Sequence, residues 1–114
     1  MDMGFMLEGN IDNKKLSVIC TGHIHDYESF KAFKNNLFNI ANSNEIAHLK
    51  DKAFETLEIK FVDSHPLPDC LIGFLLKLSE RDKIDVNITT NDNKMLSFFI
   101  SIFLDDKFNV RLFL

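Results

Sequence analysis

Two histidines one residue apart, followed by an aspartate, are the side chains in this sequence best suited to bind a metal. They are His23, His25 and Asp26, in the segment TGHIHDYESF. A zinc site needs three or four ligands that converge on one point. The other histidines, His48 and His65, lie far apart in the chain, and no HExxH motif, HxHxD motif or second His/Cys pair accompanies them. We therefore expect histidines in loops or at the surface, and no metal.

Residue types used in nucleophilic catalysis also occur next to one another, in Asp63, Ser64 and His65. Neighbours in a chain point in different directions, so three adjacent residues do not make a triad. The chain has no GxSxG motif and no glycine-rich phosphate loop, and the pair Asp105 and Asp106 is typical of a solvated turn. These observations predict a protein that is not an enzyme and has no cofactor. The alternative is a metal protein or enzyme that uses the histidine pair with His65 and Asp63.

The histidine pair is predicted to lie where a strand passes into a helix. Gly22 ends an apolar stretch and permits a bend. The carboxylate of Asp26 can accept hydrogen bonds from the free N–H groups of a first helical turn. Apolar residues then recur at spacings of three and four, which indicates an amphipathic helix ending near Asn42. These residues are Phe30, Phe33, Leu37 and Ala41.

The other elements follow from the same two periodicities. Alternation of apolar and polar residues predicts strands, and spacings of three and four predict helices. We expect strands at 4–8, 16–22, 57–62, 84–89 and 110–114, and helices at 26–42, 68–81 and 93–104. The turn-rich residues 9–13 predict a hairpin, and residues 45–54 are compatible with a short additional helix.

The order of these elements predicts an α/β domain. Strands that alternate with helices imply crossover connections and largely parallel pairing. Glu58, Lys60, Asp85 and Asn87 occupy alternate positions of two strands, whereas strands covered on both faces are apolar throughout. We expect a two-layer fold in which a mixed, mostly parallel sheet of about five strands carries its helices on one face. With 114 residues it forms one domain, 1–114.

Composition argues against two classes of partner. Thirteen basic and seventeen acidic residues give a net charge of −4, and no basic stripe suited to a nucleic-acid backbone is visible. The first residues lack the pattern of a signal peptide, and the apolar runs are too short to span a membrane.

Cys20 and Cys70 lie in apolar patterns, which is typical of buried, reduced thiols. We expect a cytoplasmic protein that binds neither nucleic acid nor membranes.

The predicted third helix, 93–104, is more apolar than one buried face requires. Its polar arc contains only Lys94, Ser97 and Ser101. A helix in a one-sided layer buries about a third to a half of its surface. Phe98, Ile100 and Leu104 are therefore candidates to contact another protein or a second copy of this chain. The alternative is that a neighbouring helix or the C-terminal residues 113–114 cover them.

Two segments resemble STAS domains, the modules of sulfate transporters and bacterial anti-sigma-factor antagonists. The segment VICTGHIHDYESFKAF resembles the family's first strand-to-helix junction, and FVDSHPLPDCLIGFLLKLSERDKIDVNIT resembles its central Asp-Ser pattern. The matching positions are Gly22, Ile24, Asp26, Asp63, Ser64 and Leu67. His25 is one extra residue, and His65 to Pro68 stand where the family has a second hydroxyl and then Gly-Leu-Gly. The resemblance covers nearly the whole chain with short motifs.

The resemblance implies a regulatory role. In many STAS antagonists an ATP-binding anti-sigma kinase phosphorylates a serine of this motif, and here that role would pass to Ser64. A phosphate beside a helix N-terminus is favourable to the helix dipole, and its charge can repel an acidic partner. Pro66 and Pro68 lack N–H donors, which makes this a poorer anion site. The alternative is that the Ser64 hydroxyl only satisfies backbone groups before the helix.

We therefore expect a small protein-binding module, switched by phosphorylation at Ser64 or used only for docking. Its predicted contact residues are Asp63, Ser64, His65, Leu67, Asp69, Phe98, Ile100 and Leu104. The resemblance implies an anti-sigma or kinase-like regulator as the partner. A homodimer formed through the third helix is the other form that we consider.

Overall fold

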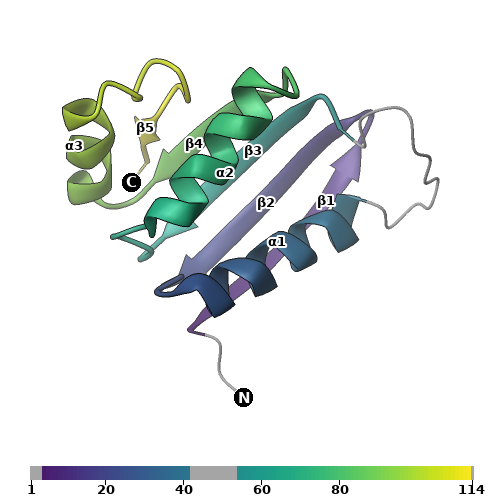
Figure 1. Ribbon diagram of the computed structural model, residues 1–114, viewed down its shortest axis with the longest axis horizontal. Coiled ribbons are helices and arrows are strands. Elements are labelled where there is room, and N and C mark those ends of the chain that lie inside the picture. Colours follow the sequence, from purple (N-terminus) through teal and green to yellow (C-terminus); the bar gives the residue numbers. More distant parts are fainter. Residues whose placement is uncertain (1–3, 42–53, 114) are drawn as a thin grey trace.

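The computed structural model describes residues 4–41 and 54–113 as a sheet with three helices (Figure 1). In chain order the elements are β1 (Phe5–Asp12), β2 (Lys15–Gly22), α1 (Tyr27–Ala41), β3 (Thr56–Val62), α2 (Asp69–Glu80), β4 (Asp85–Thr90), α3 (Asn93–Ser101) and β5 (Arg111–Leu112). The predicted order of strands and helices is confirmed. Of the predicted segment 45–54, all residues but Phe54 lie outside the described residues, and Phe54 is buried.

The five strands form one sheet in the order β1-β2-β3-β4-β5. β1 pairs with β2 in antiparallel orientation, and the other pairs are parallel. The predicted hairpin is present, but its turn was placed too early. β1 continues to Asp12, and only Asn13 and Lys14, at φ 54° and 64°, form the turn. A two-residue turn with both φ values positive matches the twist of a hairpin. Gly9 instead pairs with Val18 inside the ladder.

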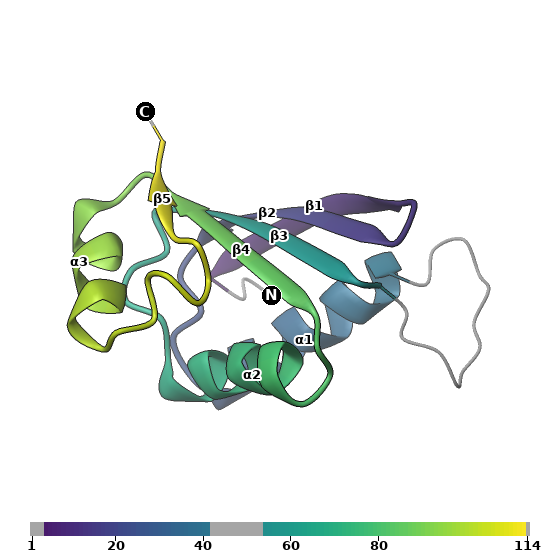
Figure 2. The same ribbon diagram turned by 90° about the horizontal axis from the view of Figure 1, so that it is seen from above.

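Two helices cover one face of the sheet, as predicted. α1 packs mainly against β1, and α2 packs against β4 (Figure 2). Glu58, Lys60, Asp85 and Asn87 all lie on strands whose alternate residues are buried, so these four face away from the helices. The largest fully buried side chains of the core are Phe33, Phe54, Phe61, Phe99 and Phe108. Rings without polar atoms can fill such a core without hydrogen-bond partners.

α3 lies at the β4–β5 end of the sheet and is shorter than predicted (Figure 1). The prediction of a helix to Leu104 was wrong, because the chain leaves the helix after Ser101. The N–H of Phe103 donates to the carbonyl of Ile100 at 3.0 Å, and the N–H of Leu104 donates to that of Phe99 at 2.9 Å. This pair of bonds is the Schellman motif, which ends a helix with one residue in the left-handed conformation. That residue is Phe103, at φ 61°.

Candidate functional site

The histidine pair lies at the predicted strand-to-helix junction. His23 and His25 are exposed, and Asp26 accepts a hydrogen bond from the N–H of Ser29 at 2.8 Å through Oδ1. This cap lowers the pKa of Asp26, mainly through the hydrogen bonds from Ser29. His48 lies outside the described residues. Among residues 4–41 and 54–113, no three His, Cys, Asp or Glu side chains gather to hold a metal ion.

Ser64 is fully buried at the end of β3. Its hydroxyl donates to the carbonyl of Val62 at 3.1 Å or to that of Cys20 at 3.3 Å. The carbonyl of Cys20 lies on the neighbouring strand β2, so the hydroxyl links the ends of two strands. The hydroxyl therefore has the local role that we considered for it, the satisfaction of backbone groups before α2.

Asp63 is fixed in place beside Ser64. It lies at φ 56°, and its N–H donates to Oδ1 of Asn91 at 3.0 Å. In return the amide of Asn91 donates to Oδ1 of Asp63 at 3.0 Å. These reciprocal bonds join the chain after β3 to the chain after β4. Because Asn91 precedes α3 by two residues, they also tie the β3–α2 loop to the start of that helix.

The rest of the β3–α2 loop divides between core and surface. Leu67 is buried, and Asp69 is exposed as the first residue of α2. His65 is half-buried, and its ring centroid lies 6.4 Å from that of Phe98 on α3. The Nδ1 atom of His65 is buried and has no hydrogen-bond partner in the described part of the chain. The two segments predicted to contact a partner, the loop and α3, therefore lie side by side.

The apolar residues of α3 do not form one face. Met95 and Phe99 are buried against the sheet. Phe98 is half-buried on the flank beside the loop, whereas Ile100 is 50% exposed and two residues further along the chain. Residues two apart on a helix point about 200° apart, so Phe98 and Ile100 lie on different flanks. Leu104 is half-buried after the helix end.

The largest exposed apolar side chain of this region was not predicted. Phe103 is 87% exposed, and Ile102 beside it is 36% exposed. We define the α3-end surface as Ile102 and Phe103, whereas Ile100 lies on another flank of α3. The exposure of Phe103 was not expected because the predicted helix continued past it, and a glycine, the usual signal of a helix end, is absent there. Of the C-terminal residues 113–114, Phe113 lies over the sheet, with its ring 4.4 Å from Nζ of Lys60, and Leu114 lies outside the described residues.

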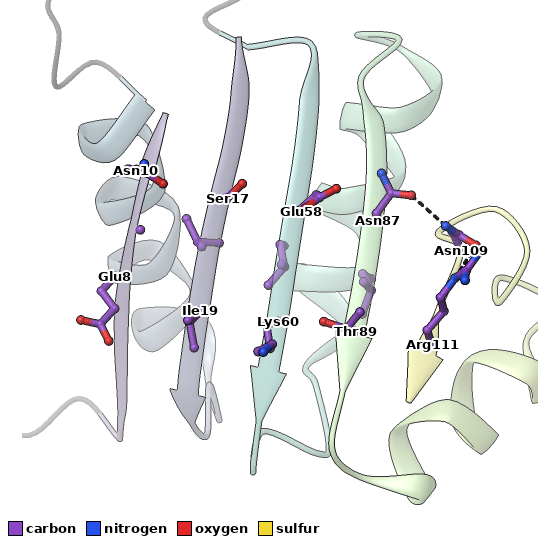
Figure 3. A pocket seen from close by; sticks show the side chains of 14 residues that line it. Glu8, Asn10, Ser17, Ile19, Glu58, Lys60, Asn87, Thr89, Asn109 and Arg111 are labelled. Carbon is purple, nitrogen blue, oxygen red and sulfur yellow. Dashed lines mark hydrogen bonds between the residues drawn. The ribbon is translucent and has the colours of Figure 1, made fainter. Parts of the chain in front are cut away.

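The face of the sheet opposite the helices forms a shallow hollow (Figure 3). One row across it contains Glu8, Ile19, Lys60, Thr89 and Arg111, and the next contains Asn10, Ser17, Glu58 and Asn87. Asn109 donates to Asn87 at 3.1 Å and accepts from Arg111 at 3.2 Å (Figure 3). Acidic, basic and neutral side chains alternate in the hollow, which is typical of a solvated sheet face.

Cys20 is buried, and Cys70 is half-buried on α2. Burial raises the pKa of the Cys20 thiol to about 11. The Ser64 hydroxyl, 4.0 Å from the Cys20 sulfur, opposes this shift only in part when it donates to the sulfur. A thiol with this pKa stays protonated at neutral pH. Cys20 therefore behaves as an apolar core residue.

No described helix is long and apolar enough to cross a membrane. No protein-family model matches this sequence, and no curated protein matches it.

Proposed function

We propose that this chain is a small protein-binding module of STAS-like plan that contacts its partner through the α3-end surface. The observation that carries this proposal is Phe103, a large aromatic side chain that is 87% exposed at a position with φ 61°. Its partner would be another protein of the cytoplasm, and the STAS resemblance favours an anti-sigma or kinase-like regulator.

Phe103 is unfavourable for the isolated chain in two ways. A non-glycine residue in the left-handed region costs roughly 1–2 kcal/mol. An exposed phenylalanine also leaves its ring in water, where it gains nothing from burial. Aromatic residues at the centre of a binding surface contribute a large share of binding energy when a partner buries them. Contact with a partner would explain both the left-handed conformation and the exposed ring of Phe103.

The neighbouring β3–α2 loop supports this function because it holds α3 in a fixed position. The Asp63–Asn91 pair fixes the start of the helix, and the His65–Phe98 contact supports one flank. A surface that is rigid before binding loses less conformational entropy when the complex forms. The predicted contact residues His65 and Phe98 would then lie beside the α3-end surface.

The burial of Ser64 favours docking without a phosphoryl switch. A kinase needs an accessible hydroxyl, and the hydroxyl of Ser64 is enclosed between Cys20 and Val62. A phosphate there would also place about two negative charges among buried groups. Phosphorylation at Ser64 would therefore require the loop to open first.

Affinity capture with matched variants tests this proposal. The tagged wild-type chain, Phe103→Gly and the control Tyr27→Ser are used for capture from the source cells, and bound proteins are quantified by mass spectrometry. Tyr27 is 59% exposed on α1, far from α3, so the control removes a comparable exposed ring. We expect a protein that is retained by the wild type and by Tyr27→Ser and is lost with Phe103→Gly. Ser64 phosphorylation is scored in the same digest.

The captured protein is then purified and titrated against the three chains by calorimetry. Loss of a central aromatic contact weakens binding by about thirtyfold or more. Equal affinity of the wild type and Phe103→Gly would contradict the proposal. Stoichiometric phosphate on Ser64 would instead support the switched form of the module.

A further inference from the structure

β1 is a long edge strand whose only charged side chains are the two acidic residues Glu8 and Asp12. Its eight residues, Phe5–Asp12, pair with β2 without interruption, and among residues 4–41 and 54–113 no strand pairs with its other side. Natural edge strands are blocked by charged side chains, above all lysine, and by proline, bulges or short length. The sequence FMLEGNID contains neither lysine nor proline, and the ladder has no bulge.

The backbone groups on the free side of β1 can be assigned from the hairpin. Asp12 and Lys15 flank the two-residue turn and form the closing pair, which is hydrogen-bonded in such hairpins. Because hydrogen-bonded positions alternate, the even residues of β1 bond to β2 and the odd ones point outward. The short bond from the N–H of His23 to the carbonyl of Gly4, at 2.7 Å, agrees with this alternation. Phe5, Leu7, Gly9 and Ile11 thus present their N–H and C=O groups to the free side.

The helix beneath this edge carries a single charged residue on the same side, at its first turn. Phe30 and Phe38 of α1 point toward α2, since the ring of each lies about 6 Å from that of Phe74. On a helix the opposite flank is occupied by Ala32, Asn36 and Ile40. Of the charged residues of α1, Glu28 begins this flank one turn before Ala32, whereas Lys31 and Lys34 lie on other sides of the helix. Small or uncharged side chains let two helices approach closely.

The sequence of β1 is complementary to itself in one antiparallel register. With Gly9 opposite Gly9 of a second copy, Leu7 of each copy lies opposite Ile11 of the other. All of these residues have N–H and C=O groups that point away from β2, so they can form hydrogen bonds between the two copies. On the other face of the sheet, Glu8 lies opposite Asn10 and Met6 opposite Asp12, so no like charges lie directly opposite each other. The equally long register with Glu8 on the two-fold axis would place two carboxylates opposite each other, which is unfavourable.

We infer that a second copy of this chain pairs with β1 about a two-fold axis at Gly9, which joins two sheets into one of ten strands. The two copies of α1 then meet through Ala32, Asn36 and Ile40 on the same face. α3 lies at the other end of the sheet order, beside β4 and β5. The dimer therefore leaves both α3-end surfaces free, at its two far ends, and this inference does not depend on the proposed function.

Charge at position 10 tests the register directly. Asn10 is exposed and would face Glu8 of the partner twice, once on each side of the axis. Asn10→Glu places like charges opposite each other and should weaken dimerisation by about tenfold, whereas Asn10→Lys should strengthen it by a few-fold. Asn35→Glu and Asn35→Lys on the outer side of α1 make the same changes of net charge and should leave the dimerisation constant unchanged.

Sedimentation equilibrium of the full chain gives the dimerisation constant of each variant. The expected wild-type result is a concentration-dependent mass that approaches twice the 13.2 kDa of one chain. A wild-type chain that stays monomeric to about 100 μM, the range of weak specific association, would overturn the inference. So would a dimer whose constant is the same for both Asn10 variants. A dimer lost with Phe103→Gly but not with Asn10→Glu would mean that α3 forms the interface instead.

Discussion

At the scale of single residues, Phe103 lowers the stability of the isolated chain while it offers an exposed ring to a partner. A left-handed residue at the end of a Schellman motif is usually glycine, because a β-carbon strains this conformation. Phe103 has this strained left-handed conformation, and its ring is exposed to solvent as well. Natural proteins keep such costly features mainly where they serve a function.

The first prediction follows from this combination. Phe103→Gly should raise the free energy of unfolding by about 1 kcal/mol, since it relieves the left-handed strain and removes no buried surface. Phe103→Ala removes the ring but keeps the β-carbon, so it should leave stability nearly unchanged. Urea unfolding followed by circular dichroism measures both. A Phe103→Gly chain less stable than the wild type would show that the ring packs against the protein in solution.

The second prediction concerns the buried thiol of Cys20, whose pKa of about 11 lies above the ordinary value of 9.0. The unfolded chain loses this proton first as the pH rises. The contribution of Cys20 is therefore fully present below about pH 9 and is lost progressively as the pH rises. At pH 11 the loss of unfolding free energy reaches about 2 kcal/mol. Stability against urea should fall more steeply over this range in the wild type than in Cys20→Ala. Parallel curves would mean that water reaches the thiol in the folded state.

At the scale of elements, the β3–α2 loop acts as a joint between the sheet and α3. Ser64 donates to the carbonyl of Val62 or to that of Cys20, Asp63 bonds to Asn91, and His65 contacts Phe98. The loop that follows β3 is therefore fixed by contacts with strand backbone groups, with Asn91 and with Phe98. Such a loop can position a helix without contributing much exposed surface itself.

The third prediction tests this joint. Ser64→Ala removes one buried hydroxyl and should cost about 1 kcal/mol of unfolding free energy. Ser64→Asp, which imitates phosphorylation, buries a charge without a partner and should cost more than about 3 kcal/mol. Thermal and urea unfolding of the two variants give the comparison. A Ser64→Asp chain as stable as Ser64→Ala would show that the loop opens readily, and it would favour a phosphoryl switch.

At the scale of the whole molecule, the two proposed surfaces lie at opposite ends of one sheet. β1 is one edge strand, and α3 packs beside the strands of the other end. A dimer through β1 would therefore present two α3-end surfaces that point away from each other. Two linked sites can bind a dense array of partners far more tightly than one.

The fourth prediction combines both surfaces. On a sensor surface densely coated with the partner protein, the wild-type dimer should dissociate about a hundredfold more slowly than Asn10→Glu. On a sparsely coated surface the two chains should dissociate at equal rates, because each then binds through one α3-end surface. A difference on the sparse surface would mean that β1 itself contacts the partner.

The sequence by itself determined the elements and the layer plan of this protein. Apolar spacing in Phe30, Phe33 and Leu37 predicted α1, and alternating polar residues such as Glu58 and Lys60 predicted an uncovered face of the sheet. Both patterns are local, because a strand or helix must bury one side whatever its neighbours are. The cap at Asp26 is equally local and was predicted from its position before the apolar pattern.

Only the tertiary structure decided where side chains of distant segments meet and which of them stay exposed. The burial of Ser64 depends on a strand that lies 44 residues earlier, at Cys20. The exposure of Phe103 depends on a helix that stops early so that the chain can return to β5. Neither outcome has a local pattern, because burial is set by packing between segments that the sequence keeps far apart.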